Sequence, residues 1–113
     1  MPLVPNIANG IVPPAKITHY LLDEAHPVGG AKARFFASFG FDSEHPEILA
    51  DALLRHAQGY DFASLQMAPH GAKYEIKGRI ATPDGSNPVV RAVWIIDHGK
   101  AVPRFVTAVP DRE

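Results

Sequence analysis

The segment "HPVGGAKARFF", residues 26–36, brings together residue types that could bind an anion and move a proton. Gly29 and Gly30 precede a run with helical spacing, and the first amides of a helix point outward at the positive end of its dipole. Lys32 adds a cation, and His26 could exchange a proton near neutral pH. A phosphodiester suits this mixture of groups. The structural alternative is a sharp link before a helix, where glycines are common.

The glycine pair matches neither of the common nucleotide-binding motifs. The dinucleotide fingerprint needs three glycines after a strand, and the phosphate-binding loop needs a lysine followed by serine or threonine. The sequence therefore predicts only a weak anion site, formed by Lys32 and the free amides of Gly29 and Gly30.

A second group of charges lies on one face of a predicted strand. Within residues 72–81, "AKYEIKGRIA", Lys73, Glu75, Lys77 and Arg79 alternate with uncharged residues and so share one side. The three positive charges on that side could line a phosphate-binding surface. The alternative is a solvated edge strand whose lysines prevent pairing with other chains.

Two polar residues interrupt apolar strands near the C-terminus. Arg91 lies within "VVRAVWII" and Thr107 within "RFVTAV". A charged residue in so apolar a strand is usually paired or functional. If Asp84 and Gly85 form a two-residue turn, Arg91 faces the same side as Tyr74, and a longer loop reverses that side. An ion pair between Arg91 and a helix carboxylate is the structural alternative.

The composition of the chain narrows the remaining chemistry. Its 113 residues include no cysteine, which excludes disulfides and thiol catalysis. None of its six histidines forms a pair at the i, i+4 spacing of a helical metal site, so we expect no metal and no cofactor. The formal net charge of −1 predicts no global attraction to nucleic acid. No apolar run reaches the roughly 18 residues that span a bilayer, so we expect a cytoplasmic protein without membrane contact.

We expect residues 1–113 to form a single domain whose first half is helical. Residues 1–13 contain several prolines and read as an extended arm, and residues 14–59 hold the helices. The predicted helices cover residues 15–22, 30–39 and 41–59. In the third of these, Asp42 or Ser43 is expected to cap the first turn.

From residue 60 onward the hydrophobic pattern changes to a period of two. The predicted strands cover residues 62–67, 72–81, 88–96 and 102–109. Short turn sequences separate the last three strands and indicate that neighbours in sequence pair. The sequence therefore predicts an α+β fold, with two or three N-terminal helices packed on one face of a three- to four-stranded antiparallel meander sheet in residues 60–113.

Three blocks of the sequence resemble the bacterial family of unknown function named DUF6883. The blocks are "YLLDEAHPVGGAKARFFASFGF", "HGAKYEIKGRIATPDG" and "VRAVWIIDHGKAVPRFVTAVP". They follow the family's order: Tyr-Leu-Leu, a histidine-proline-glycine turn, Lys-Ala with two aromatics, a Gly-x-Lys-Tyr strand, and an ending in Val-Thr-Ala. The chain departs from the family at Phe105, where leucine is usual, and at Val109, where an aromatic is common. Neither position is a candidate catalytic group.

The resemblance implies a set of site residues and a context. Transferred position by position, the family pattern falls on His26, Gly29, Lys32, Lys73, Trp94, Arg104 and Thr107. Family members occur as small proteins and as C-terminal parts of larger proteins that resemble secreted polymorphic toxins. Helices followed by an antiparallel sheet are also the plan of barnase-like and colicin-like toxin ribonucleases, which extends the resemblance by fold-level analogy.

The first of two functional hypotheses is a metal-independent, toxin-type endoribonuclease. His26 would be the general base or acid, and Lys32 and Lys73 would hold the scissile phosphate. Thr107 would position a phosphate oxygen or the 2′-hydroxyl. The expected contacts to the RNA substrate are Gly29, Gly30, Arg91, Trp94 and Arg104. A toxin of this kind would need an antitoxin or immunity protein as its partner.

The second hypothesis is a non-enzymatic interaction module of a small toxin–antitoxin or immunity system. In that case the charged strand over residues 72–81 would be a binding edge. The slightly acidic balance of the chain favours this second hypothesis, because RNA-binding surfaces are usually basic. The sequence leaves open whether the chain forms a homo-oligomer.

Overall fold

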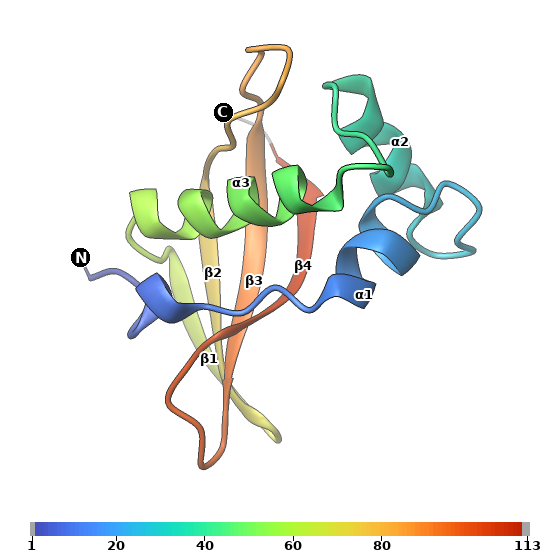
Figure 1. Ribbon diagram of the computed structural model, residues 1–113. Coiled ribbons are helices and arrows are strands. Elements are labelled where there is room, and N and C mark those ends of the chain that lie inside the picture. The colour runs from blue at the N-terminus through green and yellow to red at the C-terminus, as the bar shows by residue number, and fades with distance from the viewer. Residues whose placement is uncertain (1, 112–113) are drawn as a thin grey trace.

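The computed structural model describes residues 2–111, in which the helical elements come first and the strands follow (Figure 1). The helical elements are the 3-10 turn η1 (Ile7–Asn9), the short helix α1 (Pro14–Lys16), the π-helical turn η2 (Ile17–Leu21), α2 (Gly30–Ser38) and α3 (Pro46–Gly59). The strands are β1 (Ser64–Ala68), β2 (Gly71–Arg79), β3 (Val89–Asp97) and β4 (Arg104–Pro110). Met1, Arg112 and Glu113 lie outside the described residues. The predicted α+β class is confirmed.

The four strands form one antiparallel sheet in the order β1-β2-β3-β4, which is the predicted meander. β1 and β4 are its edges. The alternative interpretation of residues 72–81 as an edge strand is therefore wrong, because β2 pairs on both sides. The charged residues of β2 lie on the surface of the sheet and not along its rim.

The helices cover one face of this sheet, here called the inner face, and α1 and α2 lie beside β4 (Figure 1). α3 crosses the strands on the inner face. The core between the two layers is made mainly of large apolar side chains, Tyr74, Ile76, Trp94 and Phe105 from the strands and Leu49 and Leu53 from α3. Burial of each such side chain stabilises the fold by about 1.5–3 kcal/mol.

Alternate residues of each strand face the opposite side of the sheet, here called the outer face. Val93 on β3 lies opposite Glu75 on β2 and opposite Thr107 on β4, so all three belong to the outer face. An irregularity in the β3–β4 pairing next to Val93 shifts the register, and Ile95 then lies opposite Arg104. The outer face therefore joins charged residues of β2 to Thr107 on the far edge strand.

Arg91 also lies on the outer face, opposite Lys77. It therefore faces away from Tyr74, which is the side that we expected for a longer loop and not for a two-residue turn at Asp84 and Gly85. The connection between β2 and β3 is the longer loop 80–88, in which the Asp84 carboxylate accepts hydrogen bonds from neighbouring residues. A change in loop length reverses the face on which the next strand presents each residue.

The N-terminal arm is packed against the sheet. Val4 and Ile7 are buried, and Ile11 bridges to the start of β4. The amide of Ile11 donates to the carbonyl of Pro103 at 2.9 Å, and the amide of Phe105 donates to the carbonyl of Ile11 at 2.8 Å. These contacts fix the β4 edge, beside which α1, η2 and α2 then pack.

Helix α3 begins at Pro46, later than the predicted start near Asp42 or Ser43. The Asp42 carboxylate instead accepts the amide of Glu44 at 2.9 Å and bends the turn before the helix. Proline suits the first helical turn because the amide that it lacks would have no helical partner. The helix itself is confirmed.

Candidate functional site at the edge of the sheet

Lys32, Tyr20 and Thr107 meet at the β4 edge of the sheet, and we call them the Lys–Tyr–Thr cluster. The Lys32 ammonium donates one hydrogen bond to the Tyr20 hydroxyl and a second to the Thr107 hydroxyl, with Nζ and Oγ1 3.2 Å apart. The Tyr20 and Thr107 hydroxyl oxygens are also 3.2 Å apart. The three groups close a triangle of hydrogen bonds between η2, α2 and β4.

The local backbone explains how Tyr20 reaches this position. In η2 the amide of Leu22 donates to the carbonyl of Ile17 at 2.8 Å, which is the wider spacing of a π-turn. Ile17 and Leu21 are fully buried, whereas Tyr20 is only partly buried. Gly29 allows the Tyr20 ring to approach closely, since a Cβ atom at Gly29 would lie 2.6 Å from a ring carbon.

Two lysines place positive charge around the Tyr20 ring. The Lys32 and Lys16 ammonium nitrogens lie 5.0 and 5.6 Å from the ring centroid. Partial burial by itself raises the pKa of Tyr20, but the hydrogen bonds from Lys32 and Thr107 and the charges of both lysines outweigh it. The net effect is a pKa below the ordinary tyrosine value.

His26 packs against the same tyrosine and closes the turn before α2. Its ring lies edge-on to Tyr20, with centroids 5.3 Å apart. His26 Nδ1 accepts hydrogen bonds from the amides of Val28 at 3.0 Å and Gly29 at 2.8 Å. In the neutral ring the proton must then be on Nε2, and the lone pair of Nδ1 is used by these two bonds.

The same hydrogen bonds change our interpretation of the glycine turn. The amide of Gly29 donates to His26 Nδ1, and the amide of Gly30 donates to the His26 carbonyl at 2.9 Å. The free amides that we expected at these two glycines are therefore already used within the turn. Gly30 is also required sterically, since a Cβ atom there would lie 2.6 Å from the carbonyl oxygen of Glu24. The Lys32 ammonium is therefore the group of the predicted anion site that can still bind an anion.

Thr107 connects the cluster to a depression of about 230 Å³ on the outer face. The depression spans all four strands, and its lining consists of Ser64, Gln66, Lys73, Glu75, Val93, Val106 and Thr107. Lys73 is exposed there. The structure therefore brings together Lys32, Tyr20 and Thr107 directly, and places Lys73 on the surface that Thr107 borders.

The two arginines among the predicted substrate contacts form ion pairs with carboxylates outside the cluster. The Arg91 guanidinium pairs with the Glu75 carboxylate at 3.2 Å, a partner on the neighbouring strand and not on a helix. Arg104 binds Asp97 through two hydrogen bonds of 2.8 and 3.2 Å, and this pairing lowers the pKa of the Asp97 carboxyl.

Trp94 belongs to the core, which corrects its predicted role as a substrate contact. Its side chain is 0% exposed on the inner face and packs against Phe105, with ring centroids 5.6 Å apart. A residue that no ligand can reach without unfolding contributes packing. The occurrence of Trp94 in the family pattern is therefore explained by the core.

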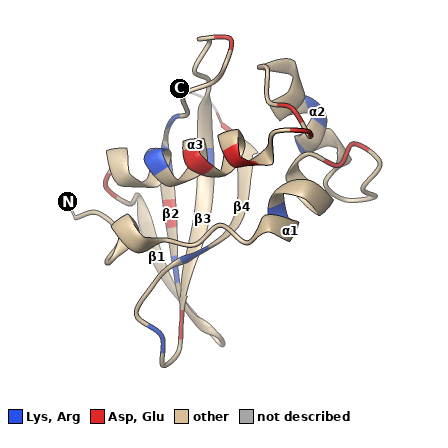
Figure 2. Ribbon diagram, viewed as in Figure 1, with Lys and Arg blue, Asp and Glu red and all other residues tan. Residues whose placement is uncertain are grey.

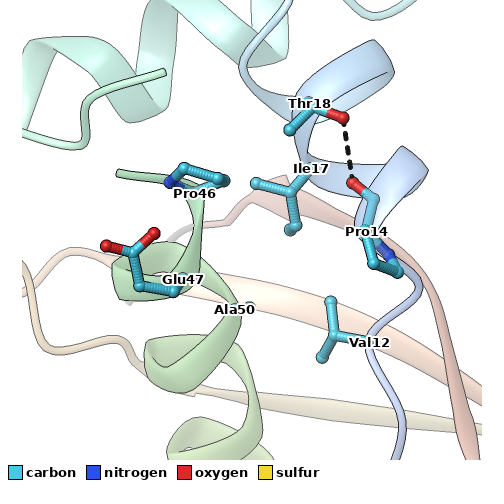
Figure 3. Close-up of a pocket in the computed structure, with 7 residues that line it drawn as sticks. All are labelled: Val12, Pro14, Ile17, Thr18, Pro46, Glu47 and Ala50. Carbon is cyan, nitrogen blue, oxygen red and sulfur yellow. Dashed lines mark hydrogen bonds between the residues drawn. The ribbon is translucent and has the colours of Figure 1, made fainter. Parts of the chain in front are cut away.

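A second depression lies between the N-terminal segment and the start of α3 (Figure 3). It has a volume of about 250 Å³ and is lined by Val12, Pro14, Ile17, Thr18, Pro46, Glu47 and Ala50. Glu47 is the one charged residue in this lining. The depression has no group of titratable side chains comparable with the Lys–Tyr–Thr cluster, and we do not assign it a function.

Charged residues of both signs lie on α3, β2 and β3, whereas α1, α2 and β4 carry basic residues and no acidic ones. In Figure 2, acidic residues lie toward the start of α3 and a basic residue toward its end, and both colours are visible on β2. Within residues 2–111 no group of three or more histidine and acidic side chains is arranged to hold a metal ion. In the same part of the chain, no helix has both the length and the apolar character needed to cross a bilayer.

Tyr20 and Lys16 are the members of this site that the sequence analysis did not identify. At α-helical spacing, Tyr20 shares a face with Ile17 and Leu21 and reads as a core residue. The available signal was its place at the head of the first block that resembles the family, six residues before His26.

The fold and the cluster together define the class of protein. It is an α+β domain with N-terminal helices on one face of an antiparallel meander and a Lys–Tyr–Thr cluster at the sheet edge. The family described as "Domain of unknown function (DUF6883)" matches residues 3–112, so the chain belongs to that family.

Comparison with known proteins identified a solved structure that shares this fold. No curated protein matches the chain. Among solved structures, a chain of the "Contact-dependent growth inhibition toxin - immunity protein complex" from Klebsiella pneumoniae 342 is similar, with a TM-score of 0.69 and 15% sequence identity. The similarity covers 89% of this chain and 99% of that chain.

Proposed function

We propose that this chain is the toxin domain of a bacterial toxin–immunity pair and that it cleaves RNA without a metal ion. The Lys–Tyr–Thr cluster, which borders a depression that also contains Lys73, carries this proposal. The similarity to a chain of a toxin–immunity complex supports the biological context, although it concerns the fold alone. An immunity protein would then be the partner that covers the site.

Each group of the cluster has a task in metal-independent RNA cleavage. The nucleophile is the 2′-hydroxyl of the RNA itself, so the protein must accept a proton, stabilise the pentavalent phosphorane and protonate the leaving oxygen. The Lys32 and Lys73 ammonium groups supply positive charge for the phosphorane. Thr107, held by Lys32, positions a phosphate oxygen. His26 holds the turn before α2 and the ring of Tyr20.

The test is cleavage of total RNA by the purified protein in the presence of EDTA. We expect fragments that end in 2′,3′-cyclic phosphate and 5′-hydroxyl groups, and no cleavage of the same sequences as DNA. A Lys32→Ala variant should cleave about 10²–10³-fold more slowly, the usual loss for one group that stabilises charge in the transition state. A Lys100→Ala variant removes the same charge from an exposed turn between β3 and β4 and should retain the wild-type rate.

The proposal is contradicted if the wild-type protein leaves RNA intact and its expression does not slow bacterial growth. It is also contradicted if Lys32→Ala and Lys100→Ala lower the rate equally, because the effect would then be one of net charge and not of the cluster.

A second candidate function is a partner-binding module without catalysis, and the β1 edge favours it. Leu65 and Met67 are 49% and 68% exposed on this strand, and β1 pairs only with β2 within the described residues. An apolar edge of this kind can accept a strand of another protein. In that case expression would leave growth unaffected, and a Leu65→Lys, Met67→Lys variant would lose its partner. If the partner is a second copy, sedimentation equilibrium would detect a dimer that this variant abolishes.

A further inference from the structure

We propose that Tyr20 is a catalytic residue of this site and that its phenolic oxygen accepts the proton of the 2′-hydroxyl of the RNA. This inference rests on the proposed ribonuclease function and names the proton acceptor within it. It follows from the hydrogen bonds of Tyr20, from the positive charges around its ring and from the bonding of His26.

The hydrogen bonds suit the ionised form of Tyr20. A phenolate has no hydrogen to donate, and here it would accept one hydrogen bond from the Lys32 ammonium and one from the Thr107 hydroxyl. Lys32 can donate to Thr107 at the same time, so all three contacts of the triangle are satisfied. The phenolate oxygen keeps a lone pair for a substrate proton.

The charges near the ring favour the same form. Lys32 and Lys16 both lie within 6 Å of the ring centroid, and a nearby cation stabilises the charged form of an acid. The pKa of Tyr20 is lowered despite the opposing effect of burial. The ionised form, which a general base requires, is therefore reached at a lower pH than for an ordinary tyrosine.

His26, the base that the sequence suggested, is less suited to this task. Nδ1, the nitrogen of the neutral ring that carries a free lone pair, already accepts hydrogen bonds from the backbone amides of Val28 and Gly29 in the turn before α2. The neutral ring carries its proton on Nε2 and cannot accept a second one there. His26 is therefore a positioning residue, which holds the turn and packs on the edge of Tyr20.

Tyr20 and Lys73 account for the two proton transfers of the cleavage step. The Tyr20 phenolate takes the 2′-hydroxyl proton as the 2′-oxygen bonds to phosphorus, and the bond from phosphorus to the 5′-oxygen breaks. The Lys73 ammonium, across the depression from Thr107, gives a proton to the leaving 5′-oxygen. Tyr20 is then protonated and Lys73 neutral, and proton exchange with water restores both after the products leave.

The experiment compares Tyr20→Phe with Tyr60→Phe in the RNA assay. Phenylalanine keeps the ring that packs against His26 and removes only the hydroxyl. Tyr60 offers the matched control because its hydroxyl accepts the amide of Arg79 at 3.2 Å, away from the cluster. We expect Tyr20→Phe to lose about 10²–10⁴-fold in kcat, the range for a removed general base, and Tyr60→Phe to stay within about twofold.

The dependence of the cleavage rate on pH distinguishes a catalytic role of Tyr20 from a structural one. The wild-type rate should rise with pH as Tyr20 ionises, and the residual activity of Tyr20→Phe should lack that rise. In Lys32→Met the rise should move to higher pH, because the neighbouring charge is gone. Absorbance at 295 nm, as the difference between wild-type protein and Tyr20→Phe, should give a Tyr20 pKa below 10 that increases in Lys32→Met.

The outcomes distinguish the two proposals. If wild-type protein cleaves RNA and Tyr20→Phe cleaves at a similar rate with the same pH profile, Tyr20 is not the base and the ribonuclease function stands. If wild-type protein does not cleave RNA, the proposed function fails and the role of Tyr20 fails with it.

Discussion

A Gly29→Ala substitution tests whether close packing of Tyr20 holds the cluster together. The new Cβ atom would lie 2.6 and 2.7 Å from two ring carbons of Tyr20, well short of the 3.4 Å at which ordinary contacts begin. The backbone of Gly29 has φ −90° and ψ −4°, which alanine adopts without strain. The cost is therefore steric, and overpacking of this kind destabilises by about 1–3 kcal/mol.

Urea unfolding followed by tryptophan fluorescence measures this cost. Trp94 is the single tryptophan of the chain and is fully buried, so its emission reports loss of the core. The comparison needs Gly29→Ala in the wild-type background and in a Tyr20→Ala background. With the ring removed, the nearest remaining atom is the Tyr20 carbonyl oxygen at 3.2 Å, and Gly29→Ala should then cost little.

The expected coupling free energy between the two positions is about 1–3 kcal/mol. Gly59→Ala serves as the control, because a Cβ atom at Gly59 meets nothing within 4 Å. If Gly29→Ala destabilises the protein equally in both backgrounds, contact with Tyr20 is not the reason for glycine at this position. The packing explanation for the Tyr20 geometry would then be refuted.

Two further predictions concern titratable groups outside the cluster. His56 is 4% exposed, and burial lowers its pKa against the opposing hydrogen bonds to backbone oxygens, so the native state resists protonation. The free energy of unfolding should therefore fall as pH decreases below about 6.5. In His56→Gln, the loss of unfolding free energy between pH 7.5 and 5.5 should be smaller by up to about 1.4 kcal/mol. If urea unfolding shows the same loss in wild-type protein and in this variant, His56 is not its source. Arg104→Ala removes a partly exposed ion pair with Asp97, so it should leave the midpoint of urea unfolding at neutral pH nearly unchanged. A large decrease in that midpoint would assign Arg104 a further structural contact.

The sequence pattern predicted the elements well where periodicity alone decides them. The strands and their meander order followed from alternation and turn residues, and α3 followed from its apolar stripe. The pattern did not assign every residue of α3 to the correct side of the helix. The sequence places Ile48 with Ala52, Leu53 and Ala57 on one apolar stripe, but Ile48 is 47% exposed and Leu49 is fully buried. At 3.6 residues per turn, Leu49 lies in the middle of the arc formed by Ala52, Leu53 and Ala57, and Ile48 lies at its margin, so the sheet covers Leu49 and leaves Ile48 exposed.

The hydrophobic pattern of the sequence could not predict the features that depend on loop length. The face of Arg91 follows from the loop 80–88, and the sequence offered a tight turn at Asp84 and Gly85 that does not form the hairpin. Residue type singled out Lys32, beside the glycine turn, and Thr107, within an apolar strand, and the family resemblance falls on both positions. Their contact joins positions 75 residues apart. Only the packing of α2 against the β4 edge makes them neighbours.

Tyr20 was missed because an α-helix was assumed where the chain forms a π-turn. At 3.6 residues per turn, residues 17, 20 and 21 share one face, and all three should enter the core. The hydrogen bond from Leu22 to Ile17 spans five residues and widens the turn, so that Ile17, Leu21 and Leu22 are buried and Tyr20 is directed toward Thr107. Insertions of this kind recur at functional sites because they redirect one side chain without disturbing the rest of the helix. The same local irregularity therefore accounts both for the missed residue and for the place of its hydroxyl beside Lys32.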